Sequence, residues 1–149
     1  MLSTQERGNE KEEDTIRKRV DAGNRHDINA MAMFYSSDVE LHDPIFPQPL
    51  KGRENIKRFW EVTLKAFPDY HEEILSIISK AEKVAVEIVG TGTFTGTLEM
   101  LGGATIPPTG KRFEFRYATF IRFDHDGLIR EARGYYDTAG LLKQLGVKL

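Results

Sequence analysis

Asp137 is the residue whose setting most clearly permits chemistry. It follows the strand-like segment Gly134-Tyr135-Tyr136 and precedes an apolar helical segment, 138–146. A carboxylate that is partly desolvated beside tyrosines has a raised pKa, which suits it to proton transfer. Asp is also favoured at helix N-termini, where its side chain accepts hydrogen bonds from backbone N–H groups. The sequence therefore predicts that Asp137 caps this helix, acts as a general acid/base, or does both.

Strand alternation extends the candidate site back from Asp137. It places Glu131, Arg133 and Tyr135 on the same face as Asp137, and we expect that face to point inward. Arg133 then either pairs with Asp137 or Glu131, or binds an anionic group of a ligand. Pairing would lower the pKa of the carboxylate that takes part.

His42 is the second candidate for catalysis. It ends the strand-like segment 39–42, just before Asp43-Pro44. A side chain with a near-neutral pKa can donate a hydrogen bond in a pocket or shuttle a proton. The alternative is a partly exposed strand histidine with one backbone partner. Asp43 itself is expected to shape the following loop through bonds from its side chain to the backbone.

Composition excludes several classes of function. The chain has no cysteine, and its four histidines are scattered without helical pairing, so no metal site is expected. A net charge of -2 and a pI of about 6.1 argue against nucleic-acid binding. There is no signal-peptide pattern and no apolar run of membrane-spanning length, so we expect a cytoplasmic location.

The spacing of apolar residues indicates which elements position these side chains. Helical periodicity covers 14–24, a short segment after Asp27, and a segment from Gly52 to Pro68. The pattern then changes to strands at 70–79, 84–95, 111–123 and 128–137, with a hairpin turn at 124–127. Helices followed by hairpin-connected strands predict a single α+β domain over 14–149, after a flexible segment 1–13. Strands this long curl, and a curved antiparallel sheet packed on N-terminal helices forms a cone with an open mouth.

Aromatic residues with helical or strand spacing supply the walls of such a cone. We expect Tyr35, Phe46, Trp60 and Phe67, with Arg133 and Tyr135, to bind the substrate. This lining would select a small, flat, apolar or aromatic molecule that carries oxygen.

Seven segments in order resemble the SnoaL-like polyketide cyclases of the nuclear transport factor 2-like superfamily. They cover the chain from about residue 14 to its end: Asp38 with Asp43-Pro44, then 52–56, 66–69, 92–96, 107–111, 126–131 and 137–146. The resemblance implies a cone-shaped α+β fold and a homodimer formed through the outer sheet face. The chain has Phe94 where the family often has histidine, and Arg133 where an aromatic residue is common.

The same resemblance implies an activity. In these cyclases an aspartate acts as general acid/base for an aldol ring closure without metal or organic cofactor, and the matching position is Asp137. The superfamily also resembles ketosteroid isomerases and limonene-epoxide hydrolases, so isomerisation and epoxide hydrolysis are alternatives on the same scaffold. A non-catalytic domain that binds an apolar metabolite is a further alternative, in which Asp137 only caps its helix.

Overall fold

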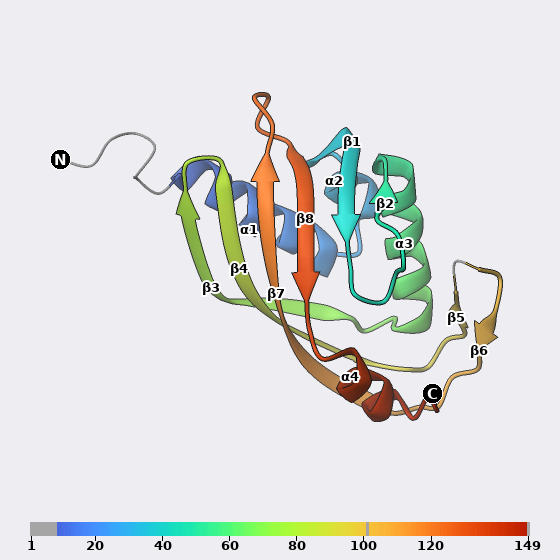
Figure 1. Ribbon diagram of the computed structural model, residues 1–149. Coiled ribbons are helices and arrows are strands. Elements are labelled where there is room, and N and C mark those ends of the chain that lie inside the picture. The colour runs from blue at the N-terminus through green and yellow to red at the C-terminus, as the bar shows by residue number, and fades with distance from the viewer. Residues whose placement is uncertain (1–8, 101, 149) are drawn as a thin grey trace.

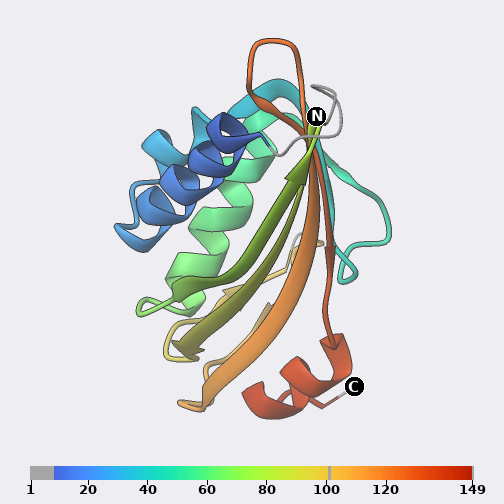
Figure 2. The ribbon, with the colours of Figure 1, turned by 90° about the vertical axis from the view of Figure 1, so that its left-hand side faces the viewer.

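The computed structural model describes residues 9–100 and 102–148. Its three N-terminal helices lie on one side of a curved sheet. Figure 1 shows the strands in front of the N-terminal helices, and Figure 2 shows the same sheet bending around them. The predicted fold class, α+β of the nuclear transport factor 2-like type, is confirmed. None of the helices in the described part of the chain is long and apolar enough to cross a membrane.

Three helices cover the concave face of the sheet. They are α1 (Glu10–Asn24), α2 (Ile28–Ala32) and α3 (Arg53–Ala66). The side chain of Asn9 caps α1 and that of Asp27 caps α2, each by accepting a backbone N–H. Because of the Asn9 cap, α1 begins four residues before the predicted start, so 10–13 belong to the helix. Residues 1–8 of the predicted flexible segment lie outside the described residues.

Six strands form the main sheet, in the order β2-β1-β8-β7-β4-β3. Their bounds are Tyr35–His42 for β1, Leu50–Lys51 for β2, His71–Lys80 for β3, Lys83–Thr93 for β4, Arg112–Phe123 for β7 and Ile129–Tyr135 for β8. The expected antiparallel sheet needs one correction, because β1 pairs with β8 in parallel. Bulges in β3, between β1 and β8, and between β7 and β8 give the strands extra twist, which curls the sheet.

A bulge at Arg130 decides which side chains of β8 face inward. Phe123 pairs with Ile129 and Arg122 with Glu131, so Arg130 is the additional residue. Because side chains alternate along a strand, one extra residue moves every later side chain to the other face. Glu131, Arg133 and Tyr135 therefore face outward, and the predicted inward orientation of this set is wrong. The residues that face inward are Ala132, Gly134 and, just after the strand, Tyr136.

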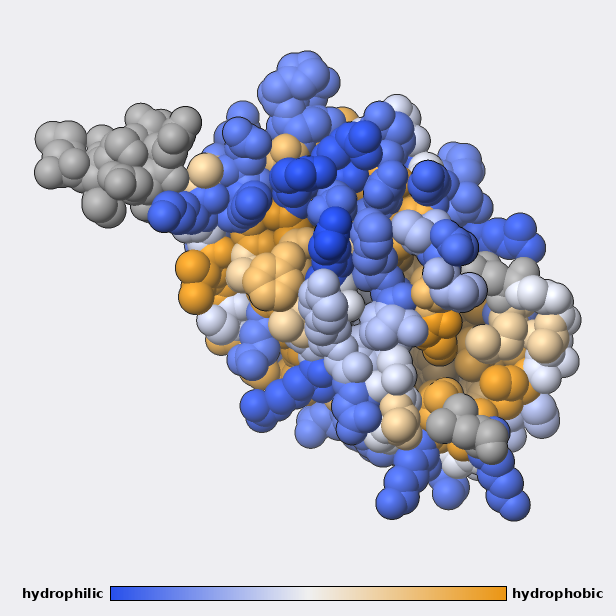
Figure 3. Space-filling view, in the orientation of Figure 1, coloured by the Kyte–Doolittle hydropathy of each residue, from blue (hydrophilic) through white to orange (hydrophobic). Residues whose placement is uncertain are grey.

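The outer face of the sheet mixes charged and aromatic residues. Phe120 is 55% exposed and Tyr135 is 56% exposed, and their rings pack edge to face at 6.0 Å. Figure 3 views the molecule from this side and shows hydrophobic residues beside hydrophilic ones. This composition is compatible with a subunit contact, and the homodimer stays a prediction.

Two smaller elements close the open end of the cone. A two-stranded ribbon of β5 (Leu98–Glu99) and β6 (Thr105–Ile106) lies beside α3, and α4 (Thr138–Leu145) packs on β7. The chain before β5 is fixed to the end of α3, because the N–H groups of Thr95 and Gly96 both bond to the carbonyl of Ala66. The approach is so close that a Cβ atom on Gly96 would lie 1.9 Å from the carbonyl oxygen of Lys65.

Replacing Gly96 with Ala should destabilise the protein, because the contact that must shift is backbone rather than a flexible side chain. We expect a loss of about 1–3 kcal/mol in the free energy of unfolding, measured by urea denaturation. Gly102→Ala is the matched control, since a Cβ atom there would meet nothing within 4 Å. Equal stability of the two variants would contradict the close approach.

Candidate functional site

A cavity of about 220 Å³ lies between the helices and the concave face of the sheet. Most of its lining is apolar or aromatic, and the predicted residues Tyr35, Phe46, Trp60 and Phe67 all contribute to it. The rings of Phe46, Phe59 and Trp60 pack edge to face in series, with centroids 5.7 and 5.4 Å apart. These walls suit a flat ligand, whereas contact of the four residues with a substrate stays a prediction.

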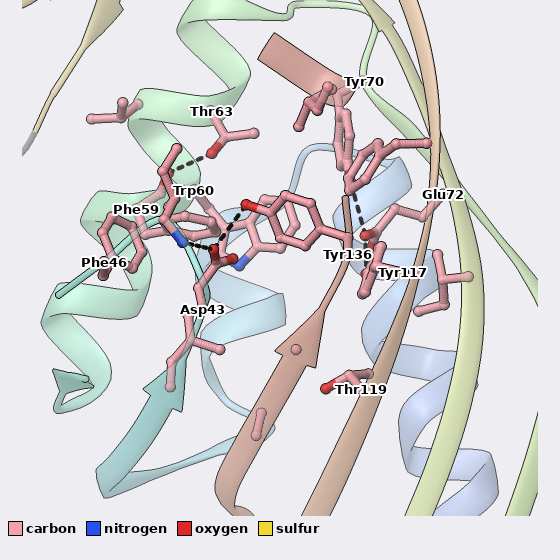
Figure 4. A pocket seen from close by; sticks show the side chains of 18 of the residues that line it. Asp43, Phe46, Phe59, Trp60, Thr63, Tyr70, Glu72, Tyr117, Thr119 and Tyr136 are labelled. Atoms are coloured by element: carbon pink, nitrogen blue, oxygen red, sulfur yellow. Dashed lines mark hydrogen bonds between the residues drawn. The ribbon is translucent and has the colours of Figure 1, made fainter. Parts of the chain in front are cut away.

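Asp43 projects a carboxylate into this apolar space (Figure 4). Its Oδ1 atom accepts hydrogen bonds from the hydroxyl of Tyr136 at 2.8 Å and the backbone N–H of Ile45 at 3.0 Å. The Oδ2 atom has no hydrogen-bond partner among the described residues, and it is not fully enclosed by protein atoms. Asp43 therefore presents one free oxygen to the space that it lines.

Burial raises the pKa of the Asp43 carboxyl, although the bonds from Ile45 and Tyr136 act in the opposite direction. The pKa of Tyr136 is also raised, first by burial and then by the nearby Asp43. The tyrosine therefore stays protonated and keeps donating its hydrogen bond. The pair combines a carboxylate that binds protons more readily than usual with a fixed donor that orients it.

Local sequence explains how Asp43 reaches this place. Strand β1 ends at His42, and Pro44 lacks the N–H group that would continue the ladder. The bond from the Ile45 N–H to Asp43 is the predicted loop-shaping contact, which is confirmed. We did not predict from the sequence that the same carboxylate oxygen also accepts a hydrogen bond from Tyr136, 93 residues away in the chain. The available signal for an inward carboxylate was Asp43-Pro44 at the end of a strand whose alternate side chains face inward.

A second carboxylate, Glu72, lies on β3, across the cavity from β1 (Figure 4). Its Oε1 accepts a hydrogen bond from Arg19 Nη1 at 2.7 Å. Its Oε2 accepts hydrogen bonds from the hydroxyls of Tyr70 and Tyr117. Burial and the nearby Glu72 raise the pKa of both tyrosines, so they remain donors. Glu72 differs from Asp43 in having both oxygens bound.

Arg19 continues this network from α1. Its Nε donates to the hydroxyl of Tyr35 at 2.9 Å, and its guanidinium lies 4.8 Å from the ring centroid of Trp60. Burial alone would lower the pKa of Arg19, but Tyr35 and Glu72 outweigh it and the pKa is raised. The sequence did carry a signal for the network, because Glu72 interrupts the apolar alternation of an inward-facing strand.

Asp137 does not line the cavity. It is exposed, and its Oδ1 accepts a hydrogen bond from the backbone N–H of Gly140 at 2.9 Å as the N-cap of α4. The capping interpretation is therefore confirmed, whereas the expected inward orientation is wrong. Arg133 pairs with Glu131 at 3.0 Å on the outer face and makes no ion pair with Asp137. Tyr135 lines a separate recess outside the cavity, under the proline-rich loop.

His42 lies where the cavity and this outer recess meet. Its Nε2 is enclosed without a hydrogen-bond partner, 3.4 Å from an oxygen of Glu40 and 3.9 Å from one of Glu131. The three side chains bring potential metal-ligand atoms within 4.8 Å of one another. Three cations also approach the two carboxylates: Lys51, Arg122 and Arg133. The negative charge of the two carboxylates is therefore largely neutralised. The role of His42 as a proton shuttle or hydrogen-bond donor stays a prediction.

Replacing Asp137 with Ala should remove the cap of α4. We expect a loss of about 1 kcal/mol in the free energy of unfolding, measured by urea denaturation. Asp137→Asn should retain most of the stability, because asparagine also accepts the capping N–H bond. A loss of the same size in both variants would contradict a capping role.

The raised pKa of Asp43 predicts a pH-dependent stability difference. The folded protein holds this proton more tightly than the unfolded chain, so wild-type stability falls as pH rises from the ordinary carboxyl pKa to the raised one. Asp43→Asn removes this loss. The variant should therefore gain stability relative to wild type at pH 7, and the gain should vanish below about pH 4. Urea denaturation at several pH values measures it, and a gain that does not change with pH would contradict the raised pKa.

Comparisons with known proteins agree with this fold. The SnoaL-like polyketide cyclase family matches residues 13–145. The structure of IdmH from Streptomyces antibioticus, a candidate polyketide cyclase, is 29% identical, with a TM-score of 0.72 over 91% of this chain and 99% of that one. AclR from Streptomyces galilaeus, a candidate hydroxylase, is 28% identical, with a TM-score of 0.74 over 91% and 95%.

A third structure extends the similarity of fold over the full length. It is a candidate SnoaL-like polyketide cyclase from Jannaschia, with a TM-score of 0.78 at 19% identity over 100% of this chain and 99% of that one. Among curated proteins, none matches this sequence significantly. The family match spans nearly the whole described chain and includes the strands and helices that build the cavity. The chain therefore belongs to the SnoaL-like polyketide cyclase family.

Proposed function

We propose that this protein is a cofactor-independent enzyme that moves a proton alpha to a carbonyl of a flat, oxygenated substrate, with Asp43 as the acid/base. The observation that carries the proposal is the state of Asp43. It lines an apolar cavity, its pKa is raised, and one of its oxygens has no partner among the described residues. A carboxylate with these properties is suited to take and return a proton near neutral pH.

The contrast with Glu72 supports this choice. Both carboxylates line the same cavity, but Glu72 accepts three hydrogen bonds, one of them from a guanidinium. These donors occupy both oxygens, so Glu72 has no free oxygen with which to take a proton from a substrate. Asp43 has its two donors on Oδ1 alone, which leaves Oδ2 to reach the substrate.

The reaction then needs only a donor for the enolate oxygen. Thr119 lines the cavity on β7, and its hydroxyl makes no hydrogen bond with the described residues. It pairs across the sheet with Gly134, which has no side chain to fill the space between β7 and the end of β1. Asp43 would remove the alpha proton while the Thr119 hydroxyl stabilises the developing enolate oxygen.

In a ring closure, the enolate carbon would then attack a second carbonyl of the same molecule. The protonated Asp43 returns its proton to the alkoxide that forms, which restores the enzyme and balances the reaction. Cyclisation is the chemistry named for IdmH and the Jannaschia relative, and flat aromatic polyketides fit against the aromatic walls of Phe46, Phe59 and Trp60. The outer recess beside Asp43 gives the carboxylate a second opening for proton exchange with water.

Replacing Asp43 with Asn should abolish most of the proton transfer and leave binding intact. We expect wild-type protein to accelerate hydrogen–deuterium exchange at C2 of 1-tetralone, followed by proton NMR in D2O. The exchange rate with the variant should be about 10²–10⁴-fold lower than with wild type, which is the usual contribution of a general base. The wild-type rate should rise with pH through the raised pKa of Asp43 and then level off, because the base is the ionised form.

Asp137→Asn is the matched control, because it makes the same change at an exposed capping position. Its exchange rate should equal that of wild type. If Asp137→Asn abolished exchange and Asp43→Asn did not, the base would be Asp137. Binding of 1-tetralone by calorimetry without any exchange would indicate a non-catalytic binding domain instead.

A further inference from the structure

Arg19 has more hydrogen-bond donors than the protein uses. Its side chain is only 8% exposed, and that of its partner Glu72 only 3%. A guanidinium carries five N–H groups. One bonds to Tyr35 and one to Glu72, and the other three have no partner among residues 9–100 and 102–148. The hydroxyl of Tyr35 accepts from Arg19, and its own hydrogen also lacks an acceptor there.

The spare donors belong to two residues that line the cavity, Arg19 and Tyr35. In the described part of the chain, only Glu12 and His42 have a fully enclosed side-chain oxygen or nitrogen without a partner. The unbonded Nη2 of Arg19 is therefore not enclosed by protein atoms. Arg19 and Tyr35 both line the cavity, and the guanidinium lies against the face of Trp60, which is another lining residue.

The charge of this end of the cavity limits what the donors can bind. Arg19 and Glu72 form a 1:1 ion pair, so the group has no net charge to attract an anion. An additional carboxylate would also lie near the negative charge of Glu72. Spare N–H and O–H donors without net positive charge match a neutral acceptor, which is the carbonyl oxygen of a ketone or quinone.

We propose that Arg19 and Tyr35 form a recognition subsite for a neutral carbonyl oxygen of the ligand, at the Glu72 side of the cavity. It lies away from Asp43, because Tyr35 begins β1 whereas Asp43 follows the last residue of that strand, and three strands separate β1 from Glu72 on β3. This inference deepens the proposed function and rests on it for the identity of the reacting end. The substrate class is then a flat aromatic molecule with carbonyl oxygens at both ends, one for the Thr119 hydroxyl beside the reacting carbon and one for Arg19 and Tyr35.

A purely structural role for the network accounts for only part of these contacts. Holding α1 on β3 requires the bond from Arg19 Nη1 to Glu72, and the paired bonds between Asn24 and the Glu72 backbone already reinforce it. This structural role requires neither the Nη2 atom of Arg19 nor the hydroxyl hydrogen of Tyr35. Variants that keep the structural contacts can therefore separate the two roles.

Calorimetric binding of three naphthalenes of similar shape tests the subsite. The probes are 2-acetylnaphthalene, 2-naphthoate and 2-ethylnaphthalene, which carry a neutral acceptor, an anionic acceptor and no acceptor. Tyr35→Phe should lower the affinity for 2-acetylnaphthalene about 3–10-fold, as expected for one lost hydrogen bond, and leave the affinity for 2-ethylnaphthalene unchanged. Glu72→Gln removes the negative charge that is paired with Arg19. The variant should therefore raise the affinity for 2-naphthoate about tenfold or more and leave the affinity for 2-ethylnaphthalene unchanged.

Tyr135→Phe and Glu87→Gln are the matched controls, because they make the same changes on the exposed face of the sheet. Neither should alter the affinity for any probe. Circular dichroism and urea denaturation establish that each variant is folded, and Tyr35→Phe decides alone if Glu72→Gln does not fold. Equal responses of 2-acetylnaphthalene and 2-ethylnaphthalene to Tyr35→Phe would overturn the subsite.

Asp43→Asn distinguishes failure of this inference from failure of the proposed function. It should abolish exchange of 1-tetralone and leave the effects of Tyr35→Phe on 2-acetylnaphthalene in place. If exchange depends on Asp43 but no probe responds to Tyr35 or Glu72, the subsite is wrong and the proposed base stands. The opposite pattern leaves the subsite standing and removes Asp43 from the chemistry.

Discussion

The buried ion pair between Arg19 and Glu72 is the interaction on which the rest of the structure depends. It joins α1 to β3, the tyrosines at 70 and 117 extend it to the start of β3 and to β7, and Tyr35 extends it to β1. Removing one partner of such a pair leaves an uncompensated buried charge, which typically costs about 3–5 kcal/mol. Because this network holds α1 over the concave face, it also fixes one wall of the cavity.

Two carboxylates in one apolar cavity have opposite roles because their donors differ. Glu72 accepts a guanidinium N–H and two phenol O–H groups, which occupy both of its oxygens. Asp43 has two donors on a single oxygen, and burial dominates its pKa. In the same low-polarity surroundings Glu72 therefore has a structural role, whereas Asp43 keeps an oxygen available for proton transfer.

Much of the fold could be predicted from the sequence because its signals are local. The periodicity of α3, the cap at Asp27, the hairpin at 124–127 and the change from helices to strands each depend on neighbouring residues, and each was found. The aromatic lining was also predictable, since it follows from spacing along α3 and β1. The orientation of the β8 side chains could not be predicted, because a one-residue bulge at Arg130 leaves no pattern in the sequence and moves every later side chain to the other face.

The sequence by itself determined the main helices and the long strands, the apolar cone and the cap of α4 by Asp137, because each depends on residues a few positions apart. Only the tertiary structure decided which carboxylate faces the cavity. The contact between Asp43 and Tyr136 spans 93 residues and that between Arg19 and Glu72 spans 53. Desolvation depends on what the rest of the chain packs around a group, so neither the raised pKa of Asp43 nor the exposure of Asp137 has a local signature.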